Sequence, residues 1–347
     1  MRTLVVSDLH LGASSGVDVL RRPSPRAALL DALDGVQRLV LLGDVLELRH
    51  GPRRDALAAA RPFFEEVGRA LSGCEIVVVA GNHDHALVES WLRRRGELPT
   101  PVPLGVEQRF PAYEASSMLA TLAEWAGPAR VSAAYPGLWL REDVYATHGH
   151  YLDCHLTVPT LERLGIGMTG RVLRRSEESF SSVDDYEAVL GPVFAWIDAV
   201  ARQAPTGSTL NGQSTVRIWR ALGGDKGGGE PGVPWRTRLL ASAFPVAVAA
   251  LNRAGLGSFR ADISGPELRR AGLRAMGEVA ARLQLRDAYL IFGHTHRRGP
   301  LPDDVQSEWV GPSGARLLNS GCWTYDSYFL SGRPGESPYW PGGAVLV

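Results

Sequence analysis

Cysteine is scarce in this sequence, which argues against a disulfide framework. The chain has three cysteines in 347 residues, Cys74, Cys154 and Cys322, and none of them forms a CxxC pair. An odd number of widely spaced cysteines is typical of reduced thiols inside a cell. We therefore expect a cytoplasmic protein without disulfide bonds.

An excess of charge and long apolar runs are missing as well. Lys+Arg and Asp+Glu both number 37, so the formal net charge is +0. This balance argues against a nucleic-acid polymer as partner, because such a partner needs clustered positive charge. The most apolar stretch, residues 239–251, is too short to span a bilayer. An apolar strand pattern begins at residue 3, which leaves no room for a signal peptide. We expect at most peripheral membrane contact.

What the sequence does have is an alternation of short apolar runs and helical periods over its first ninety residues. The expected strands are 3–7, 38–44 and 75–84, and the expected helices are 25–34, 55–71 and 85–95. Such alternation is typical of βαβ units, in which a parallel sheet is covered by helices. The apolar fraction of 45% is ordinary for a globular protein with a sizeable core.

Polar side chains follow every one of these strands. The strand ends read SDLH (7–10), GDVLE (43–47) and GNHD (81–84). Two later runs end in the same way, THGH (147–150) and GHTH (293–296). Because the carboxyl ends of parallel strands meet at one edge of a sheet, we expect these five clusters to line one site.

The five clusters contain the ligand types of a transition-metal site. The implied donors are Asp8, His10, Asp44, Asn82, His148, His294 and His296. In an extended chain, residues two apart point to one side, so the pairs at 8 and 10 and at 294 and 296 can each face one cavity. Seven nitrogen and oxygen donors are too many for a tetrahedral zinc and too nitrogen-rich for calcium or magnesium. They suit two ions of Mn, Fe, Zn, Co or Ni that share a carboxylate.

Residues 156–285 break the α/β rhythm and are predicted to form a helix-rich inserted cap. Its glycine-rich run, 223–234, lacks the Ser or Thr of a phosphate-binding P-loop, so we expect a surface loop. Trp196, Trp219 and Trp235 could line a groove for an acyl chain, although aromatic residues at helical spacing are more often part of a core.

The ordered motifs SDLH, GDxxE, GNHD, THGH and GHTH resemble those of the calcineurin-like metallophosphoesterase superfamily. Within it, GDVLEL, GHTHR and LNSGCW are most similar to the UDP-2,3-diacylglucosamine pyrophosphatase-like branch, although His83 stands where that branch often has arginine. The resemblance implies a four-layer α/β/β/α sandwich formed by residues 1–155 and 286–347. It also implies two divalent metal ions, with manganese the most expected.

Particular roles follow from the same resemblance. Asp8, His10 and His296 would bind one ion, Asn82, His148 and His294 the other, and Asp44 would bridge them. His83 would stabilise the transition state or protonate the leaving oxygen, with Asp84 orienting its imidazole; the alternative for His83 is a hydrogen-bonding role alone. Glu47 is either a supporting carboxylate or a surface one.

The implied activity is hydrolysis of a phosphodiester or a pyrophosphate by a metal-activated water, on a nucleotide-linked or lipid-linked small molecule. His150 and Arg297 would contact the substrate phosphate, although His150 could equally pack beneath its loop. A small-molecule phosphomonoesterase is an alternative function, and a catalytically inactive metal-binding scaffold is another.

Overall fold

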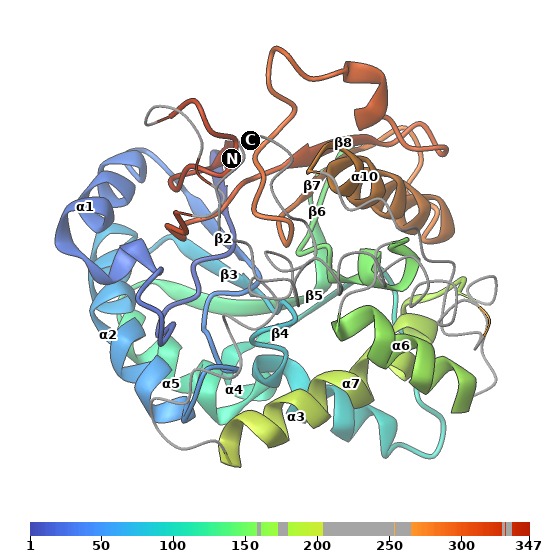
Figure 1. Ribbon diagram of the computed structural model, residues 1–347. Helices are drawn as coiled ribbons and strands as arrows, with labels where there is room; N and C mark the ends of the chain where they lie inside the picture. The colour runs from blue at the N-terminus through green and yellow to red at the C-terminus, as the bar shows by residue number, and fades with distance from the viewer. Residues whose placement is uncertain (158–160, 173–179, 204–252, 254–264, 328–329, 331–334) are drawn as a thin grey trace, which may run out of the picture.

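The computed structural model describes residues 1–157, 161–172, 180–203, 253, 265–327, 330 and 335–347. Its strands form one nine-stranded sheet in the order β8-β7-β6-β5-β3-β2-β1-β9, and β4 pairs with β5 (Figure 1). The strands are β1 (Thr3–Val6), β2 (Arg38–Leu42), β3 (Glu75–Val79), β4 (Glu107–Pro111), β5 (Arg130–Arg141), β6 (Val144–Thr147), β7 (Tyr289–Phe292), β8 (Arg316–Asn319) and β9 (Val345–Leu346). The glycine-rich run 223–234, Trp219 and Trp235 lie outside the described residues.

The helices expected in the first ninety residues are confirmed to within about two residues at each end. The α-helices are α1 (Pro23–Ala32), α2 (Arg53–Ala70), α3 (Ala86–Gly96), α4 (Ala112–Ala115), α5 (Ser117–Ala126), α6 (Leu161–Val172), α7 (Val183–Gln203) and α10 (Gly265–Arg282). Helix α1 begins at Pro23 rather than at the expected Pro25. A proline suits the first turn of a helix, where its missing N–H has no partner to lose. The 3-10 helices η1, η2 and η4 span Val19–Arg21, His150–His155 and Gln306–Trp309.

The sandwich was expected to contain two sheets, but the structure has one continuous sheet that curls at the long strand β5. Residues 130–134 of β5 pair in parallel with β3, whereas residues 137–141 pair antiparallel with β6. One strand therefore joins the half-sheet β9-β1-β2-β3 to the half-sheet β6-β7-β8. The α/β/β/α sandwich is thus built from two halves of a continuous sheet.

Alternating side chains along each strand supply the layers of this sandwich. In β1, Leu4 and Val6 pack into the core beneath α1, α2 and α5, whereas Val5 packs between the two half-sheets. In β7, Ile291 joins the same central layer, and Leu290 packs towards α10 on the outer side. Burying one such aliphatic side chain contributes about 1.5–3 kcal/mol. This packing on both faces holds the strand ends, where the polar motifs begin, at fixed positions.

Helices α6, α7 and α10 come from the segment that was expected to be a cap. Helix α10 contacts β8, and its Leu273 and Met276 are part of the buried cluster that covers β6 and β7. Tyr186 and Phe194 of α7 belong to the same cluster. The described parts of this segment therefore share a core with the second half-sheet.

Candidate metal centre

All seven predicted donors meet at the carboxyl ends of β1, β2, β3, β6 and β7. Their ligand atoms form groups in which all atoms lie within 4.8 Å of one another. The groups are Asp8 with His10 and His296, Asp44 with His148 and His294, and His10 with Asp44 and His83. Asn82 joins the second group through its Oδ1, which is 3.2 Å from ring nitrogens of both histidines there. The structure thus brings the distant motifs together, and metal binding by these seven side chains stays a prediction.

The backbone at these donors is unusual. Five of them have left-handed φ angles: Asp8 (55°), His10 (46°), Asp44 (51°), His294 (64°) and His296 (60°). Residues with a side chain rarely adopt this conformation, and each such residue costs about 1–3 kcal/mol. Strain concentrated at five residues of one cluster indicates that the arrangement serves a function, because packing alone would not favour it.

Glycines allow the loops to come this close together. Gly43 has a φ of 83°, and a Cβ at that position would collide with the ring of His148. A Cβ at Gly81 would collide with the carboxylate of Asp44. At both positions only a residue without a side chain leaves room for the donors.

The two carboxylates each have one oxygen tied to the protein and one facing the cluster. Oδ2 of Asp8 accepts hydrogen bonds from the Ser7 hydroxyl (2.5 Å) and the His294 amide (3.0 Å). Its Oδ1 is buried and has no hydrogen-bond partner among the described residues. Oδ1 of Asp44 accepts from the amide of His83 (2.8 Å), while its Oδ2 lies 3.6 Å from His10 Nε2 and 3.4 Å from His148 Nε2.

The four imidazoles are held in the same way. In each, one ring nitrogen meets an acceptor outside the cluster. The pairs are His10 Nδ1 with Glu47 (3.0 Å), His148 Nδ1 with the Leu42 carbonyl (2.9 Å), His294 Nε2 with Asp153 (3.0 Å) and His296 Nδ1 with the Thr324 hydroxyl (3.2 Å). A neutral imidazole that donates from one nitrogen presents a lone pair at the other. All four lone pairs therefore point into the cluster.

These facing lone pairs are what a cation would satisfy. His10 Nε2 and His296 Nε2 are 3.2 Å apart, although in these tautomers neither nitrogen carries a proton. Oδ1 of Asn82 likewise faces only acceptors, so that exchanging its amide oxygen and nitrogen would create three hydrogen bonds within the cluster. Acceptors aimed at one another, together with the orphaned Asp8 oxygen, fit a site for divalent cations with nitrogen and oxygen ligands.

Without a cation, protonated histidines balance the negative charges of Asp8 and Asp44. Burial alone would raise the pKa of Asp8, but the positive charge of a protonated His296, whose Nε2 lies 3.3 Å from Oδ1 of Asp8, outweighs this and lowers that pKa to about 2. Burial alone would lower the pKa of His148, but the carboxylate of Asp44 raises it to about 9. The carboxylates thus attract positive charge, and metal binding at this cluster displaces protons.

Glu47 is a supporting carboxylate, not a surface one. It is 3% exposed, and its carboxylate accepts from His10 Nδ1 (3.0 Å) and from His83 Nδ1 (2.9 Å to Oε2 and 3.0 Å to Oε1). Burial would raise its pKa, but the charge of His83 and the hydrogen bonds from both imidazoles hold the pKa well below the usual range. Glu47 therefore orients a metal-ligand candidate and His83 together.

Asp84 does not occupy the place that was predicted for it. Its described hydrogen bonds come from the backbone amides of Gly81 (2.7 Å), Asp44 (3.3 Å), Val45 (2.7 Å) and Leu46 (3.2 Å), and none comes from His83. The role of orienting His83 thus passes to Glu47. Asp84, fully buried, ties the loop after β2 to the loop after β3.

The two predicted substrate contacts are engaged elsewhere in the protein. His150 is 1% exposed and lies between the rings of Tyr135 and Phe194, which favours the packing alternative. Arg297 forms an ion pair with Asp304 (2.6 Å), and its guanidinium lies over Trp309. A substrate contact by either residue stays a prediction.

Sequence reasoning missed the acceptors that orient the ligands, above all Asp153 and Thr324. It also missed Glu187 of α7, which accepts from the hydroxyls of Tyr135 (2.5 Å) and Tyr151 (2.6 Å) and pairs with His85 (3.2 Å). Asp153 lies close to the THGH motif, which is a weak signal in hindsight. Nothing local marks Thr324 or Glu187, because their partners are distant in the sequence.

The fold and this cluster together define a metal-dependent phosphoesterase. The model of the calcineurin-like phosphoesterase family matches residues 1–197, more than half of the chain, and the chain belongs to this family. It is therefore a hydrolase of phosphoric esters that uses divalent metals. A comparison with curated proteins gave no match. Among the described helices, none combines the length and the apolar character needed to cross a membrane.

Proposed function

We propose that the chain is a dinuclear metal hydrolase that cleaves a phosphodiester or pyrophosphate bond of a small molecule. The position of Asp44 carries this proposal. Its Oδ2 lies between His10 Nε2 (3.6 Å) and His148 Nε2 (3.4 Å), which belong to different ligand groups. A carboxylate oxygen between two sets of nitrogen donors suits the bridging ligand of a two-metal site.

The proposed ligand sets follow the two halves of the cluster. Asp8, His10 and His296 bind one ion, and Asn82, His148 and His294 bind the other. When bound, two such cations lower the pKa of water and offset the negative charge of the phosphoryl oxygens. The mixture of imidazole and oxygen ligands suits Mn, Fe, Zn, Co and Ni alike, and the motif resemblance makes manganese the first candidate.

The chain itself contributes a hydrogen-bond donor beside this centre. The ring of His83 lies 4.6 Å from that of His10, and its side chain is 23% exposed, so it is open to a bound ligand. Because Glu47 accepts from Nδ1, it is the protonated form of His83, favoured by the charge of Glu47, that presents an Nε2–H to the substrate. We infer that Nε2 stabilises charge on a phosphoryl oxygen or protonates the leaving oxygen.

The motif resemblance to the UDP-2,3-diacylglucosamine pyrophosphatase-like branch supports a substrate that is linked to a nucleotide or a lipid. A small-molecule phosphomonoesterase is the second candidate, because a metal centre of this kind can bind any phosphate ester. An inactive scaffold is disfavoured by the complete donor set.

A reconstitution assay tests the proposal. Metal-free protein is loaded with Mn²⁺, Zn²⁺ or Co²⁺, and hydrolysis of bis(4-nitrophenyl) phosphate and 4-nitrophenyl phosphate is measured together with the metal content. We expect two ions per chain and preference for the diester. One ion at full activity would contradict the dinuclear assignment, and turnover of the monoester alone would favour the phosphomonoesterase.

A further inference from the structure

Two cavities lie beside the candidate metal centre, one at Asn82 and His83 and the other at Glu47. The larger, of about 490 Å³, lies between α3 and α7 and reaches Asn82 and His83. The smaller, of about 390 Å³, is formed by the loop after β1, the start of α2 and the segment from Glu47 to Pro52. Glu47 lines the smaller cavity and His83 the larger, and their hydrogen bond of 2.9 Å forms part of the wall between them.

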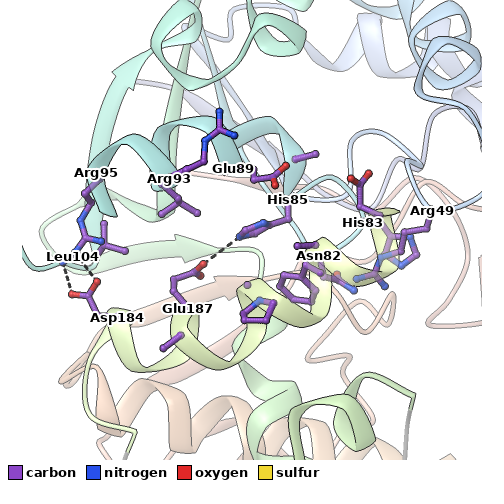
Figure 2. A pocket seen from close by; sticks show the side chains of 18 residues that line it. Arg49, Asn82, His83, His85, Glu89, Arg93, Arg95, Leu104, Asp184 and Glu187 are labelled. Carbon is purple, nitrogen blue, oxygen red and sulfur yellow. Dashed lines mark hydrogen bonds and ion pairs between the residues drawn. The ribbon is translucent and has the colours of Figure 1, made fainter. Parts of the chain in front are cut away.

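The larger cavity is elongated and has an extensive apolar wall. Figure 2 shows His83 and Arg49 at one end, Glu187 and His85 in the middle, and Leu104 at the far end. Leu92, Ala188, Pro192 and Phe194 supply further apolar lining. Arg49, whose guanidinium lies 5.6 Å from the centre of the Phe194 ring, adds a positive charge at the end nearest the centre.

The smaller cavity combines small apolar residues, such as Ala56, with polar side chains. Ser14, Arg21 and Asp55 contribute to its lining together with His50. The side chain of His50 is only 11% exposed, and its Nδ1 has no hydrogen-bond partner among the described residues. That nitrogen is buried and lies 3.7 Å from Oε2 of Glu47, so His50 and Glu47 together present a polar wall to this cavity.

We propose that the two cavities bind the two substituents of one phosphorus, so that the substrate is an unsymmetrical diester or pyrophosphate. The larger, partly apolar substituent occupies the cavity between α3 and α7, and a smaller polar substituent occupies the cavity at His50. This inference rests on the proposed function, because it requires the phosphorus to bind at the metal centre. Both volumes fall within the range of about 300–1,000 Å³ that is usual for small-molecule sites. A phosphomonoester would use only one of them.

Filling each cavity separately tests the proposal. Ala188→Phe obstructs the larger cavity from α7, and Ala59→Phe obstructs the smaller one from α2, because both alanines line them. The matched controls are Ala199→Phe on α7 and Ala58→Phe on α2, because neither alanine belongs to the lining of these two cavities. Thermal melting checks that all four variants fold. The measured quantity is kcat/KM for bis(4-nitrophenyl) phosphate and for 4-nitrophenyl phosphate.

We expect Ala59→Phe to lower kcat/KM for the diester about tenfold or more, mainly through KM, and to change the monoester less than about twofold. Ala188→Phe should lower kcat/KM for both substrates, because the single aryl group of the monoester enters the larger cavity. The controls should match the wild type. An unchanged diester rate in Ala59→Phe, or equal losses of both esters, would overturn the assignment of the smaller cavity. A metal-loaded wild type that cleaves neither ester would instead refute the proposed function.

Discussion

Replacement of Glu47 by glutamine is the most direct test of how the centre is organised. The carboxylate receives three N–H groups: His10 Nδ1 at 3.0 Å, His83 Nδ1 at 2.9 Å and the Arg49 amide at 3.0 Å. A glutamine has the same shape, but one of its two terminal atoms donates instead of accepting. At least one imidazole must then adopt the other tautomer, in which the proton is on the ring nitrogen that faces the cluster.

The magnitude follows from this change of tautomer. If His10 is the imidazole that changes, its Nε2 carries a proton where a lone pair is required, and one ligand of the first group is lost. Loss of a partner that orients a metal ligand typically lowers metal affinity 10- to 100-fold, which corresponds to about 1.4–2.7 kcal/mol. The amide nitrogen buried against N–H groups costs about 1–3 kcal/mol of folding stability as well.

Metal titrations of the apo-protein, followed by calorimetry and by metal analysis after dialysis, measure the affinity directly. The control is Glu65→Gln, because Glu65 pairs with Arg61 on the exposed face of α2, where the described residues give it no other ion pair. We expect weaker metal binding and lower turnover in Glu47→Gln and no change in the control. Unaltered affinity for both ions in Glu47→Gln would refute the reasoning about tautomers.

Four further outcomes are expected. His83→Ala should retain both ions and lose about 100-fold or more in kcat; an unchanged kcat would remove His83 from the reaction. Asp44→Asn should lose metal as well as rate, and two ions per chain by metal analysis would contradict its bridging role. Glu187→Ala leaves two tyrosine hydroxyls without their acceptor, so urea unfolding should show a loss of about 3 kcal/mol, and Glu187→Gln a smaller one; equal losses would contradict this account. Chelation should lower the melting temperature, since ions present at 100 times Kd add about 2.7 kcal/mol, and an unshifted melting curve would argue against bound metal.

The seven donors could be predicted from the sequence because each follows an apolar strand run in a parallel sheet. Because the carboxyl ends of parallel strands lie at one edge of a sheet, residues that follow different strands come close together. Asp8 and His148 could therefore be placed together although they are far apart in the chain. The residues that orient them could not be predicted. Asp153 reaches His294 and Thr324 reaches His296 only because β7 pairs with β6 on one side and with β8 on the other, an order that no local pattern indicates.

The two half-sheets themselves required the structure. The first three strands can be predicted from their alternation with helices. In contrast, β6, β7 and β8 have only four residues each and are widely separated in the sequence. Their order depends on the antiparallel step at β5, which no local signal marks. The mistaken role of Asp84 has a similar cause, since adjacency to His83 in the sequence suggested a contact that the turn after β3 prevents.

The position of α10 and α7 changes how the inserted segment is best divided. Helix α10 lies within residues 156–285, yet it covers the outer face of β8 and its Met276 is fully buried in the core of the second half-sheet. Tyr186 of α7 is also fully buried in that cluster, and Glu187 beside it accepts hydrogen bonds from β5 and η2. We propose that the metallophosphoesterase core resumes at residue 265, not 286. On this division α7 has two roles, because one face completes the core while the other forms a wall of the larger cavity. A change on the cavity face of α7 can therefore alter substrate range without disturbing the core, whereas a change at Glu187, which lines that cavity, also removes the acceptor of Tyr135 and Tyr151.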